Sequence, residues 1–262
     1  MTAKPRVLVL RTAGTNCDAE TAFAFQYVGA KVCLAHVNQL LNGRERLADY
    51  HILALPGGFT YGDDIASGRI LANELRRRLG EDLRAFIDAG KLILGICNGF
   101  QVMVKMGLLP DGMDAGQRAS LTHNDSGRFE DRWVHLRVEA ESVWTKGLPS
   151  RVYYPVAHAE GKFVVPSRTA LKALRDQGRV AFTYCSADGG PPGYPDNPNG
   201  SMGHIAGITN ATGRLLGLMP HPERCFLSEQ HPFWARLSDK GTFREGALIF
   251  DNGVRYARRH LL

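Results

Sequence analysis

A short stretch of the chain, Lys91–Met106 (KLILGICNGFQVMVKM), reads as a buried strand that turns directly into a helix. The apolar residues Leu92–Leu94 form the strand, and a helical pattern begins at Phe100. Cys97 lies at the tip of the turn in a Gly-x-Cys-x-Gly pattern, whose small flanking residues let strand and helix pack closely. A thiol at a helix N-terminus loses its proton more easily, and nearby N–H groups can hold an oxyanion. Cys97 is therefore a candidate nucleophile, although a buried structural cysteine would fit the same pattern.

A second segment, near the C-terminal end, also runs from a strand into a loop with reactive groups. The apolar run Leu215–Met219 reads as a buried strand, and it leads into Pro220-His221-Pro222-Glu223-Arg224. A nucleophilic cysteine needs a base, and the base needs a group that orients it. His221 can serve as the base, and Glu223 can hold its imidazole because Pro222 fixes the backbone between them.

The two loops would lie together if both strands belonged to one parallel sheet, because sites in α/β proteins form at the carboxyl edge of the strands. We therefore predict that Cys97, His221 and Glu223 form a triad in this chain order. A lone His-x-Glu would ordinarily indicate a solvated loop, so the prediction depends on this placement.

Two polar runs in the second half of the chain leave alternatives open. Val156–Phe163 (VAHAEGKF) puts His158 and Glu160 directly after a strand, which offers another His/Glu pair for the triad. The more constrained loop favours His221, but the spacing alone does not decide between the two histidines. The run at His123–Arg132 (HNDSGRFEDR) is typical of a binding loop and equally of a surface turn.

The strand-end sequence Pro56-Gly57-Gly58 is a candidate site for anion binding. Glycine amides at a strand end can approach a ligand closely, and Asn98 follows Cys97 in the turn described above. The amides of Gly58 and Asn98 could together form an oxyanion hole, although Pro-Gly-Gly also occurs as a simple tight turn. Gln101, one turn into the helix, could reach a substrate amide or carboxylate, or could simply be a polar position on a helix.

The first hundred residues alternate between strand and helix patterns, which predicts a mainly parallel sheet covered by helices on both faces. The second half carries alternating apolar and polar residues, which predicts antiparallel strands, before an amphipathic terminal helix at Glu245–Arg259. We expect an α/β fold with an antiparallel extension, in a single domain spanning 1–262. The expected strands are Arg6–Leu10, Lys31–Val37, Leu47–Leu55, Trp133–Glu139, Arg151–Ala157, Arg179–Cys185, Ile205–Ile208 and Arg214–Met219, and the expected helices are Asp18–Val28, Ile70–Leu79, Glu81–Ala89 and Leu171–Asp176.

Composition excludes several other classes of protein. Lys and Arg exceed Asp and Glu by six, but no basic stripe is interleaved with aromatic residues, so we expect no nucleic-acid binding. The five cysteines are odd in number and have no Cys-x-x-Cys spacing, which favours reduced thiols in the cytoplasm. No stretch approaches a membrane span or a signal peptide. His221 and Cys225 are weak evidence for a metal site, so we expect none.

Taken together, these residues resemble the class I (triad-type) glutamine amidotransferases, and the match spans nearly the whole chain. The class is recognised by Gly95–Gln101 (GICNGFQ), by Pro56-Gly57-Gly58 and by His221-x-Glu223. Asn98 is a narrower mark, because most members carry a bulky apolar residue there. Further narrow marks are Gly14–Asp18 (GTNCD), Pro56–Asp64 (PGGFTYGDD), Ala157–Phe163 (AHAEGKF), Pro198–Ser201 (PNGS) and Gly217–Arg224 (GLMPHPER). These marks are similar to those of members that supply ammonia to a synthetase of purine biosynthesis.

The resemblance implies a flavodoxin-like sheet and a chemical role for each triad residue. Cys97 would attack the side-chain amide of glutamine. His221 would take the thiol proton and then protonate the leaving ammonia, while Glu223 holds His221. Water would then release glutamate.

The resemblance also implies binding roles. The amides of Gly58 and Asn98 would stabilise the tetrahedral oxyanion. Gly57, Gln101 and His158 would contact the glutamine substrate.

Family members of this size act with a separate, larger synthetase subunit that uses ATP and Mg²⁺, and some also need a small third subunit. The resemblance therefore implies no cofactor in this chain itself. Ammonia would pass through the assembly to the amide carbon of formylglycinamide ribonucleotide.

Three other interpretations compete with this one. A glutaminase that serves a different synthase would keep the chemistry and change the acceptor, but Asn98 and the PNGS motif speak against it. A non-catalytic regulatory module would fit better if Cys97, His221 or Glu223 had been replaced. A cysteine peptidase on a similar sheet would cleave peptides and ignore free glutamine.

Overall fold

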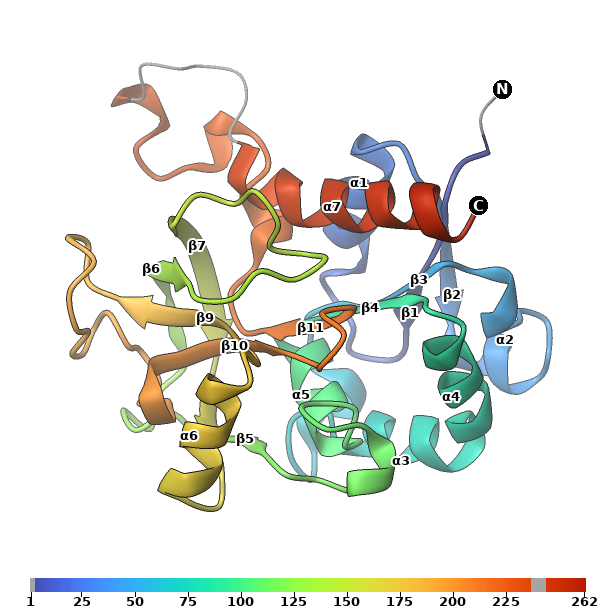
Figure 1. The fold of residues 1–262 in the computed structure, drawn as a ribbon, viewed down its shortest axis with the longest axis horizontal. Helices are drawn as coiled ribbons and strands as arrows, with labels where there is room; N and C mark the ends of the chain where they lie inside the picture. Colours follow the sequence, from blue (N-terminus) through green and yellow to red (C-terminus); the bar gives the residue numbers. More distant parts are fainter. Residues whose placement is uncertain (1–2, 237–243) are drawn as a thin grey trace.

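The computed structural model describes residues 3–236 and 244–262. A nine-stranded sheet runs through the molecule in the order β2-β1-β3-β4-β11-β10-β9-β6-β7 (Figure 1). Its strands are β1 (Arg6–Arg11), β2 (Lys31–His36), β3 (Ile52–Leu55), β4 (Leu92–Ile96), β6 (Glu130–Val138), β7 (Arg151–His158), β9 (Val180–Cys185), β10 (Ile205–Thr209) and β11 (Leu215–Leu218). Two short strands, β5 (Ser120–Thr122) and β8 (Lys162–Val164), form a separate antiparallel pair.

The sheet has a parallel half and an antiparallel half. The strands from β2 to β11 pair in parallel, whereas β10, β9, β6 and β7 continue the sheet by antiparallel pairing. The predicted α/β fold with an antiparallel extension is therefore confirmed. β4 and β11 are parallel neighbours, so the loops that follow them emerge at the same edge, as the triad prediction required.

Helices cover both faces of the parallel half (Figure 1). Helices α1 and α7 lie on one face and contact each other, and α3, α4 and α5 lie on the other. The helices are α1 (Asp18–Tyr27), α2 (Val37–Leu41), α3 (Arg69–Arg78), α4 (Gly80–Asp88), α5 (Asn98–Lys105), α6 (Arg168–Asp176) and α7 (Arg244–His260). Short 3₁₀ turns are η1 (Leu47–Asp49), η2 (Thr60–Asp63), η3 (Met113–Ala115), η4 (Met202–His204), η5 (Pro222–Arg224), η6 (Ser228–Gln230) and η7 (Trp234–Arg236).

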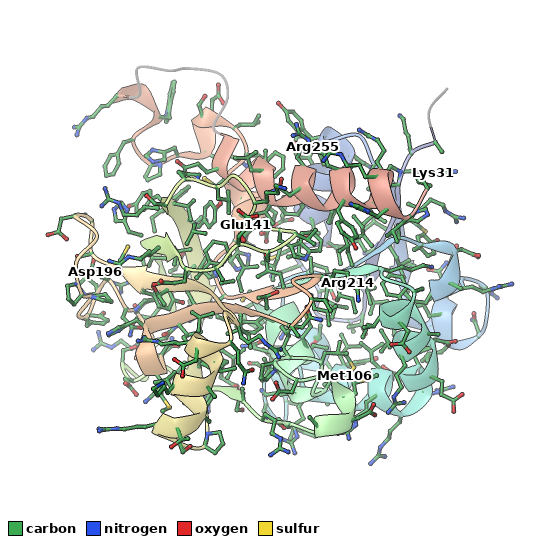
Figure 2. The ribbon with its side chains drawn as sticks, in the orientation of Figure 1. Lys31, Met106, Glu141, Asp196, Arg214 and Arg255 are labelled. Atoms are coloured by element: carbon green, nitrogen blue, oxygen red, sulfur yellow. The ribbon has the colours of Figure 1, made fainter. Side chains whose placement is uncertain are left out.

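The central strands read as continuous apolar runs because both of their faces are buried. Ile52–Leu55 and Leu92–Ile96 are buried at every position. The rings of Phe25 on α1 and Phe250 on α7 pack edge to face, with centroids 4.9 Å apart. Apolar side chains fill the space between helices and sheet, whereas charged ones such as Lys31 and Arg255 lie at the surface (Figure 2).

The structure corrects the sequence prediction in local details. Helix α2 was not predicted, because it follows β2 without a break; a capping box formed by His36 and Gln39 starts it there. The expected strand Leu47–Leu55 begins as the 3₁₀ turn η1. Strand β6 begins at Glu130 rather than Trp133, so the polar run before it is partly strand. None of the helices in residues 3–236 and 244–262 is long and apolar enough to cross a membrane.

Candidate active site

Cys97 lies in the tight turn between β4 and α5, as the sequence predicts. Its backbone has φ 50° and ψ −106°, a strained conformation for a residue with a side chain. The flanking glycines are needed for packing: a Cβ on Gly99 would lie 1.8 Å from the carbonyl oxygen of Leu55, and one on Gly95 would lie 2.4 Å from Met103 Sδ. The strained turn therefore presents Cys97 at the start of α5.

His221 and Glu223 meet in the loop that follows β11. His221 Nδ1 and Glu223 Oε1 are 2.7 Å apart, and each side chain is almost completely buried. His221 Nε2 and Glu223 Oε2 have no hydrogen-bond partner within the described residues. Burial alone would lower the pKa of His221, but the charges of Glu223 and Cys97 outweigh it and raise that pKa well above its ordinary value. The imidazole can therefore take and keep a proton.

Strand β7 holds the thiol and the base against its free edge. The carbonyl of Pro155 accepts a hydrogen bond from the backbone N–H of His221 at 2.8 Å. The Cys97 thiol donates to the carbonyl of Ala157 at 3.6 Å. The charge of Cys97 also raises the pKa of His221, so the thiol and the imidazole lie near each other.

A second thiol, Cys17, lies beside the imidazole and was not predicted to belong to the site. Arg224 Nη2 donates to Cys17 Sγ at 2.9 Å, and Arg224 Nε donates to Glu20 Oε1 at 3.3 Å. Burial raises the pKa of Cys17, and the neighbouring His221 opposes that rise. These contacts join the start of α1 to the loop that carries His221. Sequence reasoning noted the GTNCD motif but had no signal for its position in space.

Cys17, His221 and Glu223 place ligand atoms within 4.8 Å of one another, a spacing that metal ligands can adopt. The guanidinium of Arg224 already brings a positive charge against the thiol of Cys17, which disfavours a cation there. The expectation of no metal stays a prediction. All five cysteines are unpaired thiols.

The Pro-Gly-Gly segment after β3 lies against the base. A Cβ on Gly57 would lie 2.8 Å from His221 Cε1 and 2.9 Å from Cys17 Sγ, so only glycine lets the backbone come this close. Gly58 forms an isolated antiparallel bridge with Thr15. The hydrogen bonds of that bridge belong to the residues on either side, from Phe59 N to Gly14 O and from Asn16 N to Gly57 O. The N–H of Gly58 is therefore not used in the bridge.

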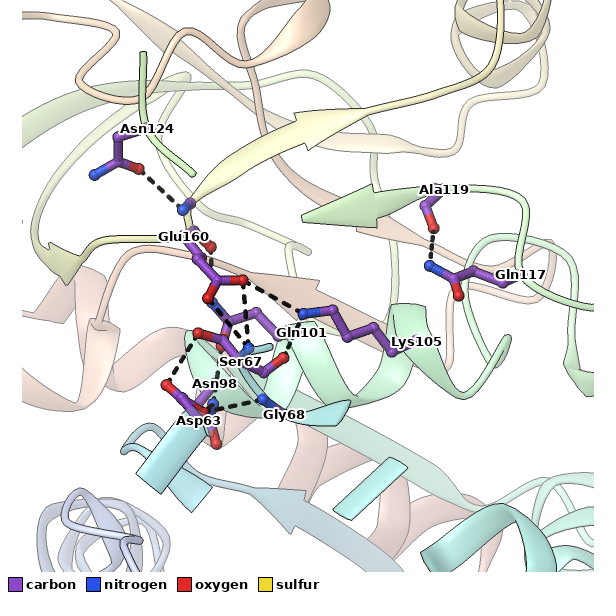
Figure 3. Close-up of polar contacts among 11 residues, drawn as sticks. Asp63, Ser67, Gly68, Asn98, Gln101, Lys105, Gln117, Ala119, Asn124 and Glu160 are labelled. Atoms are coloured by element: carbon purple, nitrogen blue, oxygen red, sulfur yellow. Dashed lines mark hydrogen bonds and ion pairs between the residues drawn. The ribbon is translucent and has the colours of Figure 1, made fainter. Parts of the chain in front are cut away.

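Gln101 and Asn98 are joined by their side-chain amides (Figure 3). Asn98 Nδ2 donates to Gln101 Oε1 at 2.9 Å, and Gln101 Nε2 donates to the backbone carbonyl of Glu160 at 2.7 Å. Asn98 Oδ1 accepts from the N–H of Thr60 at 3.3 Å. The side chain of Gln101 is thus bonded at both ends within the chain. Its role in binding glutamine stays a prediction, and the structure assigns it to a polar network.

The same network contains two carboxylates and a buried lysine (Figure 3). Asp63 accepts from Ser67 Oγ, from the N–H of Gly68 and from Asn98 Nδ2, at 2.9 to 3.2 Å. Lys105 Nζ donates to the carbonyl of Ser67 at 2.6 Å and lies 3.6 Å from Glu160 Oε2. Burial raises the pKa of Asp63 and lowers that of Lys105. These contacts, which the sequence did not reveal, fasten the turn after η2 to helix α5.

The alternative base, His158, lies near the site but is not paired with Glu160. The carboxylate of Glu160 accepts from the N–H of Ser67 at 3.3 Å and faces Lys105 instead. His158 Nε2 is 3.5 Å from Asn199 Nδ2. Burial lowers the pKa of His158 to about 3, so its ring is neutral. The structure therefore does not pair His158 with Glu160, and it favours His221 as the base.

Comparison with known proteins places this geometry in a family. Residues 4–257 match the model of the CobB/CobQ-like glutamine amidotransferase domain. The chain is 47% identical to the phosphoribosylformylglycinamidine synthase subunit PurQ of Dehalococcoides mccartyi, over 98% of this chain and 99% of that relative. The PurQ of Archaeoglobus fulgidus is 40% identical, over 97% of each chain.

Solved structures agree with these relatives. A chain in the structure of PurLQS from Thermotoga maritima aligns with a TM-score of 0.72 at 30% identity, covering 97% of this chain and 99% of that one. A glutamine amidotransferase of Thermotoga maritima aligns with a TM-score of 0.55 at 16% identity over 98% of each chain, which shows the fold alone.

Proposed function

Because the chain belongs to the CobB/CobQ-like glutamine amidotransferase family, we propose that it is the glutaminase subunit of phosphoribosylformylglycinamidine synthase. It hydrolyses glutamine and supplies ammonia for the ATP-dependent amidation of formylglycinamide ribonucleotide. The observation that carries the proposal is the full-length match to PurQ subunits, in a chain that holds Cys97, His221 and Glu223 at one sheet edge.

The reaction begins with the transfer of the Cys97 thiol proton to His221. Nε2 of His221 is available for that proton, because Nδ1 is held by Glu223. The sulfur then forms a bond to the side-chain amide carbon of glutamine, and the carbonyl electrons move to oxygen. This oxyanion accepts hydrogen bonds from the N–H groups of Gly58 and Asn98, the latter at the start of α5 where the helix dipole favours negative charge.

The intermediate collapses when its C–N bond breaks. The proton on His221 passes to the leaving nitrogen, so that ammonia departs and a γ-glutamyl thioester remains on Cys97. His221 then deprotonates a water molecule, which attacks the thioester and releases glutamate and the free thiol. The C–S bond breaks as that proton passes from His221 to the sulfur, so both side chains return to their starting state.

The proposal includes the partners of the reaction. The similar chain from Thermotoga maritima belongs to a structure of PurLQS, which supports an assembly with a large synthetase subunit and a small third subunit. ATP and Mg²⁺ act on the synthetase subunit, and this chain needs no cofactor of its own. The five unpaired cysteines support a reducing cytoplasm as its location.

Glutamate release tests the proposal directly. The chain is assayed alone and together with the large synthetase subunit, ATP, Mg²⁺ and formylglycinamide ribonucleotide, and the amidated product is measured in parallel. Glutamine-dependent product with stoichiometric glutamate is expected in the complex. Glutamate without amidated product would indicate another acceptor, and cleavage of peptides in place of glutamine would indicate a peptidase.

A further inference from the structure

Three buried polar atoms lie together where β6 begins and β7 ends, and none has a hydrogen-bond partner within the described residues. They are Glu130 Oε1, Arg132 Nε and His158 Nδ1. The antiparallel register sets Glu130 opposite His158 and Arg132 opposite Val156, so the three side chains share one face of the sheet. Buried polar atoms without partners cost free energy, and a group of them points to a ligand.

Glu130 and Arg132 also form an ion pair with each other. Glu130 is almost completely buried, whereas Arg132 reaches toward the surface beneath Tyr194. The guanidinium carbon lies 5.1 Å from the Tyr194 ring centroid, and Nη2 is 3.1 Å from the hydroxyl. Each member of the pair therefore keeps one unused atom, a carboxylate oxygen that accepts and a guanidinium N–H that donates. A ligand that carries an ammonium beside a carboxylate could donate to the free carboxylate oxygen and accept from the free guanidinium N–H.

Strand β7 connects this cluster to the nucleophile. The carbonyl of Ala157, the residue before His158, accepts the hydrogen bond of the Cys97 thiol. Burial is the main reason that the pKa of His158 is low, and the charges of His221 and Arg132 both lower it further, so both groups lie near His158. In glutamine only two methylene groups separate the amide carbon from the α-carbon. A molecule whose amide lies at Cys97 therefore has its charged end within reach of the cluster.

We propose that Glu130 and Arg132 bind the amino-acid end of glutamine, an inference that rests on the proposed function. The free oxygen of Glu130 accepts hydrogen bonds from the α-ammonium, and Nε of Arg132 donates to the α-carboxylate. The neutral ring of His158 adds no charge that would repel either group. Because both charges of the zwitterion are needed to satisfy the cluster, the site selects free glutamine over amides in peptides.

Two truncated amides separate the two contacts. 4-Carbamoylbutanoate is glutamine without the ammonium, and 4-aminobutanamide is glutamine without the carboxylate. The assembled enzyme, with its synthetase subunit, is assayed for kcat/KM with glutamine and for the inhibition constant of each analogue. In Glu130→Gln, kcat/KM for glutamine should fall about 10- to 100-fold, the effect of one hydrogen bond to a charged group. Inhibition by 4-carbamoylbutanoate, which lacks the ammonium, should be unchanged.

Arg132→Lys gives the reciprocal test, because it keeps the positive charge beside Glu130 and loses the planar fork. Glutamine and 4-carbamoylbutanoate should bind more weakly, and inhibition by 4-aminobutanamide should be unchanged. Asp131→Asn is the matched control: it lies between the two on β6, is exposed and belongs to the opposite face of the sheet. It should leave all three constants as in the wild type.

The outcomes separate this proposal from the function on which it rests. If Glu130→Gln weakens glutamine and both analogues equally, the cluster is structural and the subsite is overturned. The subsite is also overturned if both variants leave kcat/KM unchanged. If the wild-type complex releases no glutamate from glutamine, the proposed function itself fails, whatever the variants do. Thermal unfolding of each variant identifies a loss that comes from misfolding.

Discussion

The two sides of Cys97 are built differently. On one side, His221 and Glu223 share a hydrogen bond, yet each keeps a buried polar atom without a partner within the described residues. On the other side, Asn98 and Gln101 use both ends of their amides within the chain. The side with His221 and Glu223 therefore keeps hydrogen-bonding capacity for a reaction, whereas the side with Asn98 and Gln101 fixes the turn. Substitutions on the first side should lower activity, and substitutions on the second should lower stability.

Cys97 is the nucleophile, and its replacement should have the largest effect on glutamine-dependent activity. Cys97→Ser should lower glutamine-dependent product formation by about 10³-fold or more, because a hydroxyl is a much weaker nucleophile beside the same base. Ammonia-dependent synthesis by the complex should be unchanged, since the synthetase does not need the thiol when ammonia is supplied. Steady-state assays with each nitrogen source check this. Loss of both activities would mean that Cys97 holds the assembly together.

On the reactive side, the two nearby histidines should behave differently. His221→Ala should reduce kcat about 10³-fold, because no other group takes the thiol proton. His158→Ala should raise KM about tenfold with little change in kcat, because the lost interactions are the same in ground and transition states. Measurement of kcat and KM for both variants shows which histidine is the base. A large loss of kcat in His158→Ala, with only a higher KM in His221→Ala, would assign the base to His158.

On the side of Asn98 and Gln101, Lys105→Met should mainly lower the stability of the fold. It leaves the partly buried carboxylates of Asp63 and Glu160 without the buried cation that faces them, which should lower the free energy of unfolding by about 3 kcal/mol. Urea unfolding of the variant beside wild type measures this. Lys172→Met is the control, because the ion pair that Lys172 makes with Asp176 is exposed and should contribute little. Equal stability of Lys105→Met and wild type would show that the network does not fasten the turn.

The two buried histidines should give opposite pH dependences of stability, which is the smallest effect. The pKa of His158 falls from 6.5 to about 3 on folding, so its contribution is present above pH 6.5 and is lost as pH falls toward 3. Between pH 6.5 and 5 this amounts to about 2 kcal/mol. The pKa of His221 is raised on folding, so its contribution is present below pH 6.5 and is lost as pH rises through its folded value.

Unfolding free energies of wild type and His158→Asn across pH 5 to 8 check the sign. The variant should lose less stability than wild type on the acid side. A variant curve parallel to that of wild type would mean that folding does not lower the pKa of His158.

The sequence predicted those parts of the site that depend on residues close together along the chain. The turn at Cys97 depends on glycines two residues away on either side, and Glu223 reaches His221 across a single proline, so local patterns suffice. Lys105 meets Glu160, and Cys17 meets Arg224, only because segments distant along the chain come together in the fold. Nothing in the local sequence pattern specifies those contacts. For the same reason, the run that contains Glu130, opposite His158 on β6, fitted a binding loop and a surface turn equally well.

The contact of β7 with the loop that follows β11 and carries His221 has a consequence for solubility. β7 is the last strand of the sheet, and Pro155 has no N–H to offer at its free edge. The outward carbonyls of Pro155 and Ala157 are occupied by His221 and Cys97. The loop that carries the base thus also caps an edge to which a strand of another molecule could otherwise add. Variants that displace this loop should lose activity and self-associate together.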